Sequence, residues 1–320
     1  MKKKNKYIFI SSGYRGGATT FLSQHMQYLV SKKKNIVLID DNPKNTFEYL
    51  HSKINKLKIN VSKGNNESKI KVNNILNFGE EKKFLFITNY AILIKYFFIL
   101  KNFRNKGNKI IMTIHSGILN LNLKTFSAGI IFSLLYKNLD FLYFGSSSAK
   151  NWWVSKYPWM NISKCPVYYN GVELVKNVKT KKLKKKINIS FVGRLEKEHN
   201  PNFFIEIANK YLMKNKNVIF NIFGDGSMLH KLKEKIVSKK IIFHGWVKKR
   251  EIYKNSDIVI ITSPHQNYPY AALEAKSFGI PVISCSTGDI SKIVKHNFDG
   301  LVKHTDSSTE MINLIDKALN

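Results

Sequence analysis

The sequence is short of cysteine, proline and glycine, which excludes several classes of protein. Its 320 residues include 2 cysteines, 7 prolines and 17 glycines. Cys165 and Cys285 lie far apart, so we expect no disulfide framework and a reducing, cytoplasmic compartment. So little proline and glycine is typical neither of a fibrous nor of a disordered chain. With 43% hydrophobic residues, the sequence predicts a globular protein.

Long apolar segments are missing as well. The most apolar stretch, Phe84–Leu100, is interrupted by Asn89 and Lys95 before it reaches the roughly 20 residues that a membrane-spanning helix needs. It predicts a buried strand followed by a helix. The apolar run within the start MKKKNKYIFISSGYRGG is too short for a signal peptide and leads into a glycine turn.

Acidic residues are scarce: 21 face 53 lysines and arginines, which gives a formal charge of +32. Nucleic-acid binding, attraction to an anionic membrane or substrate, and a general bias toward Lys, Asn and Ile could each produce such a charge. We expect no nucleic-acid partner, because the basic residues are dispersed and no nucleic-acid-binding module is present. The part of the positive charge that a general bias toward lysine does not explain favours phosphate-bearing or membrane-surface partners.

Apolar runs rich in Ile, Val and Phe alternate with helical stretches along the whole chain, which predicts an α/β fold with parallel sheets. The length is sufficient for two such domains. We expect residues 1–174 and 187–320 to form Rossmann-like domains, joined by a Lys-rich linker at 175–186. The predicted strands are Tyr7–Ser11, Asn35–Asp40, Phe84–Thr88, Lys109–Ile114, Phe141–Gly145, Ile187–Val192, Val218–Phe223, Ile241–Phe243, Ile258–Thr262 and Val282–Ser284.

A glycine turn, SSGYRGGATTF, follows the first strand and leads into a helix. Backbone amides at Gly13, Gly16 and Gly17 could cradle phosphate there. No lysine precedes Thr19 or Thr20, so a P-loop ATPase is disfavoured. Alternatively, the glycines only allow a tight turn.

The segment ISFVGRLEKEHNPN places Gly193 and Arg194 at the end of a strand, before a helix with Asn200 as its cap and Pro201 as its first residue. An anion would be held there by Arg194 and by the helix dipole. The alternative is an ordinary solvated arginine.

Three further motifs follow in the second half. Gly224 and Gly226 end one strand and Trp246 follows another, where a flat base could lie against the backbone. In SPHQNYPYAALEAKSFG, the carboxylate of Glu274 lies about one turn into a helix and could accept hydrogen bonds from sugar hydroxyls. Alternatively, these glycines are common turn residues and Glu274 only complements the helix dipole.

Taken together, the second half resembles family 4 of the retaining glycosyltransferases, through FVGRLEKEHNP, FGDGSM, FHGWV, QNYPYAALEAKSFGIPVIS and FDGLV. The first half matches more loosely, through SSGYRGGATTFLSQHMQYLVSKKKNIVLI, TIHSG and VYYNGVEL. The resemblance implies the GT-B fold, in which two Rossmann-like domains face each other across a cleft. It assigns the acceptor to the first domain and the nucleotide-sugar donor to the second.

The resemblance also implies roles for individual residues. Arg194 would bind the donor diphosphate, Glu274 the nucleotide ribose, and His115 the donor sugar. For His115 the alternative is a strand-end histidine satisfied by the backbone. These three are the predicted catalytic residues. The predicted donor-binding residues are Gly16, Gly17, Gly193, Arg194, His199, Gly224, Gly226, Trp246, Gln266, Asn267, Tyr268, Pro269, Tyr270, Ala271 and Glu274.

Two positions depart from the family pattern. His199 stands where the family usually has a lysine, and Gln266 replaces the first of two glutamates. A diphosphate beside His199 would raise its pKa, but its charge depends on pH where that of a lysine does not. Gln266 keeps the hydrogen-bonding geometry and loses the negative charge.

The resemblance predicts a retaining hexosyl- or N-acetylhexosaminyl-transferase that uses a nucleotide sugar, UDP-linked by preference, as co-substrate and no other cofactor. No Asp-x-Asp motif is present, so we expect no metal and a same-face displacement. A saccharide or lipid-linked acceptor in bacterial surface polysaccharide synthesis, such as lipopolysaccharide, O-antigen or capsule, is expected. The rival functions are a sugar-nucleotide epimerase of the same fold and a basic nucleic-acid binder.

Aromatic residues interleaved with lysines in the first half suggest contact with an anionic membrane or a lipid-linked acceptor. We therefore expect peripheral attachment to the inner face of the cytoplasmic membrane. The alternative is that most of these aromatic side chains belong to the core. They are Tyr96, Phe97, Phe98, Trp152, Trp153 and Trp159.

Overall fold

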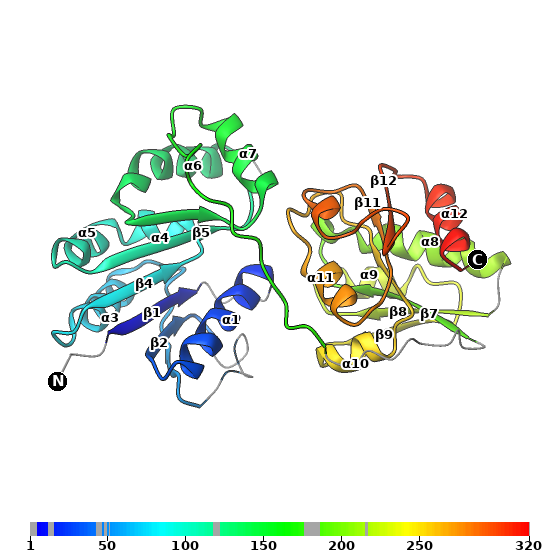
Figure 1. The fold of residues 1–320 in the computed structure, drawn as a ribbon, viewed down its shortest axis with the longest axis horizontal. Coiled ribbons are helices and arrows are strands. Elements are labelled where there is room, and N and C mark those ends of the chain that lie inside the picture. Colours follow the sequence, from blue (N-terminus) through cyan, green and yellow to red (C-terminus); the bar gives the residue numbers. More distant parts are fainter. Residues whose placement is uncertain are drawn as a thin grey trace. The chain divides into compact units, whose positions relative to one another are not determined.

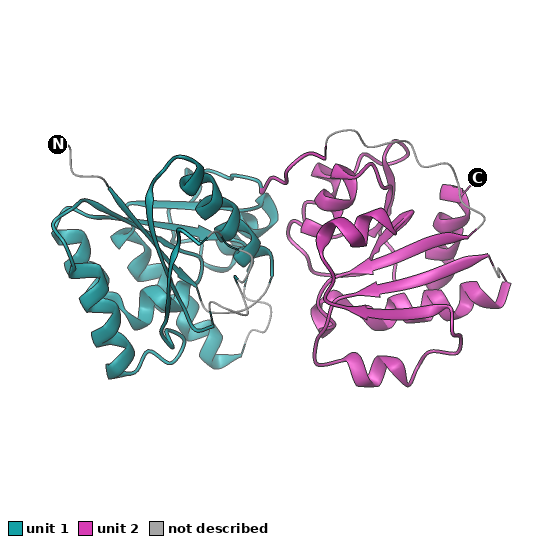
Figure 2. Ribbon diagram, turned by 90° about the horizontal axis from the view of Figure 1, so that it is seen from below, with its two compact units in different colours: residues 1–169 teal, residues 170–320 magenta. Residues whose placement is uncertain are grey.

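The computed structural model divides the chain into two compact units, residues 1–169 and 170–320 (Figure 2). The residues that it describes are 5–11, 16–42, 47, 50, 52–117, 122–175, 186–214 and 217–319. The division lies close to the predicted end of the first domain at residue 174. Most of the predicted linker, residues 176–185, lies outside the described residues.

The first unit is built on a six-stranded parallel sheet with the order β3-β2-β1-β4-β5-β6 (Figure 1). Its strands are β1 Lys6–Ser11, β2 Asn35–Asp40, β3 Asn55–Lys58, β4 Lys83–Ile87, β5 Lys109–Ile114 and β6 Phe141–Phe144. Its helices are α1 Gly17–Ser31, α3 Asn66–Asn77, α4 Tyr90–Lys95, α5 Phe97–Asn105, α6 Leu123–Leu135 and α7 Ser147–Lys156, with a short 3-10 turn η1 at Tyr136–Asn138.

The second unit repeats this plan, with the strand order β12-β11-β10-β7-β8-β9. Counted from its own first strand, this order is the same as in the first unit. The strands are β7 Ile187–Val192, β8 Val218–Phe223, β9 Ile241–Gly245, β10 Ile258–Ile261, β11 Val282–Cys285 and β12 Gly300–Lys303. The helices are α8 Pro201–Lys214, α9 Leu229–Lys233, α10 Lys249–Lys254, α11 Tyr270–Ser277 and α12 Ser308–Leu319, with 3-10 turns η2 Lys197–His199 and η3 Ile290–Lys292. Both units are Rossmann-like.

The central strands are predominantly apolar because both faces of each sheet are covered. In β10, Ile258 and Ile260 pack into the core beneath α8 and α12. The alternate residues Val259 and Ile261 join a second core on the opposite face, which includes side chains of α10 and α11. Continuous Ile and Val runs are therefore what this sheet requires, and they explain why the strands could be found from sequence.

All ten predicted strands are present with bounds that differ by at most two residues. The sequence prediction missed β3 and β12, each of which is one of the two edge strands of its sheet. β3 reads Asn-Lys-Leu-Lys, and none of its residues is buried. With so few apolar residues β3 leaves little signal in the sequence, which a strand paired on one side only can tolerate.

The apolar stretch Phe84–Leu100 forms most of β4, the whole of α4 and the start of α5. The predicted strand is therefore present, and two short helices follow it in place of the one predicted. No helix within the described parts of the chain is both long and apolar enough to cross a membrane. 

The lysine-flanked aromatic residues do not form one surface. Tyr96 and Trp153 are 1% and 0% exposed and belong to the core, and Trp152 packs against it. Phe98 and Trp159 are exposed. Phe97 is half-buried. Three of the six side chains thus belong to the core or pack against it and two are exposed, so neither the membrane-contact prediction nor the core alternative holds for the whole set.

Substitution of Phe204 tests the core of the second unit. This α8 side chain is fully buried between Phe191 and Phe220, with ring centroids 5.6 and 5.7 Å away. We expect Phe204→Ala to lower the free energy of unfolding by about 3–5 kcal/mol, because it leaves a cavity. Met213→Ala on the same helix, where Met213 is 81% exposed, should change it by less than about 0.5 kcal/mol. Urea unfolding followed by circular dichroism measures both, and equal losses would contradict the packing described here.

Candidate functional site

The predicted donor residues of the second unit gather at one edge of its sheet. The strand order reverses between β7 and β10, and ligands of open α/β sheets bind at such a switch point, beyond the carboxyl ends of the strands. Arg194 lies in the loop after β7, Trp246 in the loop after β9, and Gln266 in the loop after β10. Loops after β8 and β11 complete this edge.

Backbone contacts join the loops after β7, β8 and β9. The Gly193 amide donates to the Phe223 carbonyl at 3.0 Å, and the Gly224 amide donates to the Gly245 carbonyl at 2.8 Å. Gly224 has φ +134°, and a Cβ there would lie 1.9 Å from the Gly193 carbonyl oxygen. A Cβ at Gly226 would lie 2.5 Å from a carbonyl oxygen of the β7 loop. These glycines are thus required by loop packing, which the prediction of a base-binding surface did not consider.

The loops after β10 and β11 are joined in the same way. The Gln266 amide donates to Thr287 Oγ1 at 2.8 Å, and the Asp289 amide donates to the Asn267 carbonyl at 2.8 Å. Gly288 has φ +46°, and a Cβ there would lie 2.0 Å from the Gln266 carbonyl oxygen. Gln266 and Asn267 are therefore held by a neighbouring loop that the sequence prediction did not include.

Arg194 pairs with a residue that the sequence prediction missed. Its Nη2 donates to Glu198 Oε1 at 2.8 Å, and the two side chains are 38% and 32% exposed. Pro201 is the first residue of α8, as predicted. Asn200 has φ +48° and is not in the extended conformation usual for a cap residue, and its carbonyl accepts from Thr262 Oγ1 at 3.0 Å. The guanidinium is thus held near the start of α8 but shares its charge with Glu198.

The two residues that depart from the family pattern contact each other. Gln266 Nε2 lies 2.5 Å from His199 Nδ1, and Ser263 Oγ lies 3.4 Å from the same nitrogen. Burial, followed by the charge of Arg194, lowers the pKa of His199 to about 4. His199 is therefore neutral at physiological pH. When its Nδ1 accepts from Gln266, its Nε2 carries the proton and remains a donor.

Glu274 lies in α11, one turn after the start of the helix, as predicted. Its Oε1 pairs with Lys249 Nζ at 2.6 Å, and its Oε2 accepts from the Tyr253 hydroxyl at 2.8 Å. Burial and the Glu274 charge raise the pKa of Tyr253. Both partners come from α10, so this helix fixes the carboxylate. Each oxygen keeps a further lone pair that a sugar hydroxyl could use.

The remaining predicted donor residues lie around this edge. Trp246 is 54% exposed. Pro269 caps the start of α11, and Tyr270 is the first residue of that helix. Tyr268 and Ala271 are partly buried and pack against the core beneath β10 and β11. Their side chains therefore support the loop, and only Trp246 among these five offers a large exposed face.

In the first unit, His115 follows β5 and is packed among aromatic and small residues. Its ring centroid lies 4.8 Å from that of Phe21 in α1. A Cβ on Gly145 would lie 2.6 Å from His115 Nδ1, so this glycine leaves the space that the imidazole occupies. Burial, followed by His25, lowers the pKa of His115 to about 4, and its Nε2 lies 3.4 Å from Thr113 Oγ1. His115 is a neutral hydrogen-bonding group.

The predicted phosphate loop of the first unit is only partly described, because residues 12–15 lie outside the described residues. Gly16 caps α1, and its amide donates to Thr19 Oγ1 at 2.9 Å. A Cβ at Gly16 would meet nothing within 4 Å. Gly17 is the first residue of α1, one turn before Phe21, so the start of this helix and His115 lie at the same edge of the first sheet.

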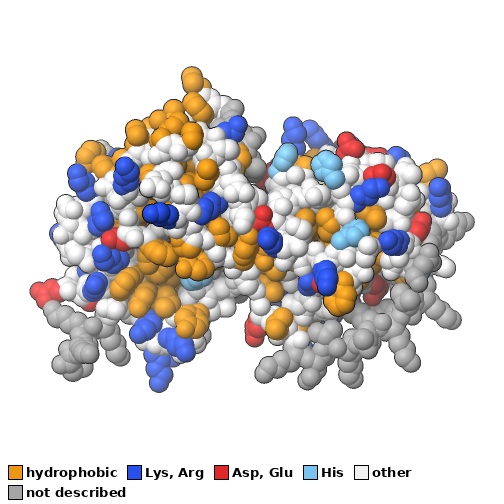
Figure 3. Space-filling model, turned by 45° about the horizontal axis from the view of Figure 1, so that its top comes forward, with side chains coloured by type: hydrophobic (Ala, Val, Ile, Leu, Met, Phe, Trp, Pro, Cys, Tyr) orange, Lys and Arg blue, Asp and Glu red, His pale blue; other side chains and the backbone are white. Residues whose placement is uncertain are grey.

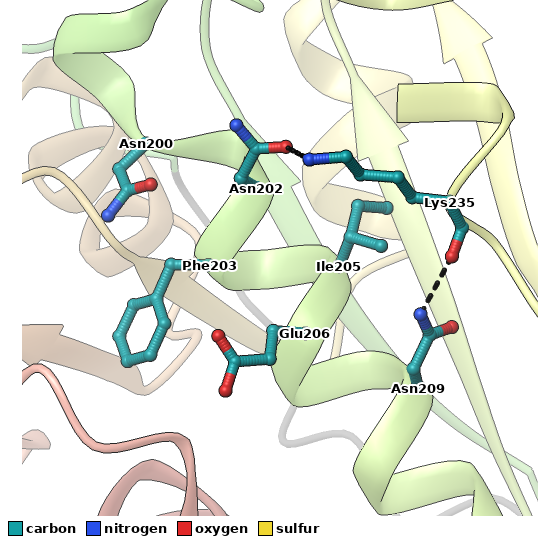
Figure 4. A pocket seen from close by; sticks show the side chains of 7 residues that line it. All are labelled: Asn200, Asn202, Phe203, Ile205, Glu206, Asn209 and Lys235. Atoms are coloured by element: carbon teal, nitrogen blue, oxygen red, sulfur yellow. Dashed lines mark hydrogen bonds between the residues drawn. The ribbon is translucent and has the colours of Figure 1, made fainter. Parts of the chain in front are cut away.

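A hollow of about 410 Å³ lies beside α8 (Figure 4). Asn202 Oδ1 accepts from Lys235 Nζ at 2.9 Å there, and Asn209 Nδ2 donates to the Lys235 carbonyl at 2.8 Å. It is lined by Asn200, Asn202, Phe203, Ile205, Glu206, Asn209 and Lys235. None of these is a predicted donor residue. Within the described residues, no group of three His, Cys, Asp or Glu side chains could hold a metal ion.

Comparison with known proteins defines the class of the fold. Residues 174–320 match the family model described as glycosyl transferases group 1. The structure of Anabaena HepE in complex with UDP and glucose superimposes with a TM-score of 0.81 at 15% identity, covering 98% of this chain and 89% of that one. The chain therefore has the GT-B fold of glycosyltransferases, with two Rossmann-like units.

Two related sequences are more specific. An Escherichia coli UDP-Gal:α-D-GlcNAc-diphosphoundecaprenol α-1,3-galactosyltransferase is 33% identical over 186 residues, which cover 50% of this chain and 47% of that protein. A 41.2 kDa protein in the cps region of Klebsiella pneumoniae is 24% identical over 245 residues, which cover 71% of this chain and 66% of that protein. The chain thus spans about half to two thirds of the length of these relatives.

Exchange of His199 and Gln266 tests whether they act as one pair. His199→Lys alone would place a second cation next to Arg194, where Glu198 is already paired with Arg194 and Glu196 is already bonded to Ser227. Gln266→Glu alone would add an anion in a partly buried position. We expect each to lower the free energy of unfolding, and the double variant to recover part of the loss through a new ion pair. A double-mutant cycle in urea should give a favourable coupling of about 1–3 kcal/mol. Strictly additive losses would show that the two side chains are independent.

The neutral histidines predict a dependence of stability on pH. The unfolded state takes up the His199 proton near pH 6.5, whereas the folded state resists it to about pH 4. The stability is therefore intact above pH 6.5 and falls as the pH drops toward 4, with a slope approaching about 1.4 kcal/mol per pH unit for one such histidine.

His199→Gln should reduce this slope in unfolding experiments between pH 6.5 and 5. His230→Gln is the matched control, because the His230 side chain is 92% exposed. An unchanged slope in the His199 variant would contradict its burial as a neutral group.

Proposed function

We propose that the protein is a retaining glycosyltransferase that moves a hexose or N-acetylhexosamine from a UDP-sugar to a saccharide or lipid-linked acceptor in surface polysaccharide synthesis. The observation that carries this proposal is the placement of Arg194, His199 and Glu274 at the switch point of the second sheet. The UDP and glucose bound by HepE and the diphosphoundecaprenol acceptor of the E. coli relative support it.

The leaving group of this reaction is a nucleoside diphosphate, which gains negative charge as the bond to the anomeric carbon breaks. Arg194 is the cation placed to receive that charge, near the start of α8. In the free protein Glu198 occupies its Nη2, so the donor phosphates would share or displace that contact. His199 adds a neutral N–H donor beside it. We propose that no metal ion or further cofactor is needed.

Glu274 is proposed to accept the ribose hydroxyls. Lys249 and Tyr253 hold the carboxylate in one orientation, so that its free lone pairs need little reorganisation on binding. The exposed Trp246 ring is suited to contact the uracil base. Lys249 would thus be a positioning residue.

The chemical step is proposed to occur on one face of the sugar. The bond between the anomeric carbon and the phosphate oxygen breaks, the acceptor oxygen bonds to the same face of that carbon, and the leaving phosphate takes the acceptor proton. His115, being neutral, would orient the sugar through a hydrogen bond and not through charge. A lipid-linked acceptor would place this reaction at the inner surface of the cytoplasmic membrane.

Thermal stability with and without nucleotides tests the donor site. We expect UDP and UDP-sugars, but not DNA, to raise the melting temperature. A ligand concentration one hundred times the Kd should stabilise the folded state by about 2.7 kcal/mol. Arg194→Ala should weaken UDP binding by about tenfold to a hundredfold, because a charge-assisted hydrogen bond is lost, and lower kcat by about a hundredfold.

Lys197→Ala is the matched control, because Lys197 is an exposed cation of the same loop. Equal shifts for the wild-type protein and the Arg194 variant would refute the assignment of the diphosphate site.

A further inference from the structure

An apolar surface in the first unit has no part in the donor site. Along the outer side of α6, Leu123, Phe126, Ile131 and Leu134 are 86%, 42%, 43% and 66% exposed. They recur at helical spacing on the side opposite Phe132, which is fully buried and lies 5.1 Å from the Trp153 ring. Figure 3 shows hydrophobic side chains gathered over the top of the first unit, where Figure 1 places α6 and α7.

Trp159 extends this surface beyond α7. Its ring is 56% exposed, and its Nε1 donates to Ser133 Oγ of α6 at 2.8 Å. Tyr157 lies between the two parts, since its ring contacts both Phe126, at 6.3 Å, and Trp159, at 5.6 Å. The indole is therefore fixed in an exposed position by a contact that its own polar atom makes. We call Leu123, Phe126, Ile131, Leu134 and Trp159 the α6 face.

The surroundings of the α6 face are basic. Residues 122–172 contain five lysines and one acidic residue, Asp140. That carboxylate is already paired with Arg104 at 3.3 Å and Lys109 at 2.9 Å, so it offsets little of the positive charge near α6. Lys124 and Lys137, in and directly after α6, are exposed. An apolar face with exposed lysines at its sides matches the two layers of an anionic lipid surface, acyl chains and phosphates.

From this geometry we propose that the α6 face docks on an anionic membrane surface. The convex side of one helix fits a fluid interface, which needs no complementary groove. A second copy of the chain is a poorer occupant, because it would bring lysines against lysines. The surface differs from the predicted aromatic cluster, of which it retains only Trp159. It rests on the proposed function only for the expectation that a lipid-linked acceptor lies in the same membrane.

Flotation with lipid vesicles tests the proposal on the full chain. We expect binding to phosphatidylcholine vesicles that contain phosphatidylglycerol, weaker binding at high salt, and little binding to phosphatidylcholine alone. Phe126→Glu with Leu134→Glu should lower the partition coefficient at least about tenfold. The matched control is Phe98→Glu, since Phe98 of α5 is 83% exposed in the same unit and lies outside the face. It should bind as the wild-type protein does.

Fluorescence adds a second readout. Brominated lipids should quench tryptophan emission in the wild-type protein and in Trp246→Phe. Most of this quenching should be absent in Trp159→Phe. Equal binding to neutral and anionic vesicles, equal losses in the α5 and α6 variants, or a dimer in sedimentation that the double variant abolishes would overturn the proposal. Stabilisation by UDP should persist in the double variant, so failure of the membrane proposal is distinguishable from failure of the donor site.

Discussion

The candidate site depends on two close backbone approaches at the carboxyl edge of the second sheet. A Cβ at Gly224 would lie 1.9 Å from the Gly193 carbonyl oxygen, and one at Gly288 would lie 2.0 Å from the Gln266 carbonyl oxygen. Only the absence of a side chain lets the loops after β7 and β8, and those after β10 and β11, pack in this way. This packing fixes the backbone of the loops that carry Arg194 and Gln266, so their side chains start from defined positions.

Within that frame, the site carries little net charge. Arg194 is paired with Glu198 and Glu274 with Lys249, so each of these charges is balanced by a partner. His199 and Gln266 form a third pair, in which both side chains are uncharged. An anionic donor would therefore be attracted mainly by the field of the whole chain, with its formal charge of +32, and held locally by short-range hydrogen bonds. A lysine in place of His199 would sit beside Arg194 at a cost in repulsion, which the neutral histidine avoids.

The sequence was sufficient for ten of the strands and for the order of the site motifs, because both follow from local patterns: buried β-branched runs and glycines at strand ends. It could not show that Glu198 and Lys249 pair with Arg194 and Glu274. The contact between Lys249 and Glu274 joins residues 25 positions apart in the sequence, and nothing in either segment signals the other. The edge strand β3 was missed for a related reason. Its pairing with β2 makes it a strand, whereas its own residues show no apolar pattern.

The apolar surface of the first unit also could not be predicted from local sequence alone. Tyr96 and Trp153 lie near lysines in sequence, yet both are core: Tyr96 lies between α4 and α5 and donates to Ser68 of α3, and Trp153 is a buried residue of α7. Helix α6 is apolar nearly all round, and such a helix would ordinarily be read as fully buried. Its outer side chains are exposed instead, in a chain whose strong positive charge opposes self-association. This positive charge opposes association of two such faces, and it is also the charge that an anionic bilayer would attract.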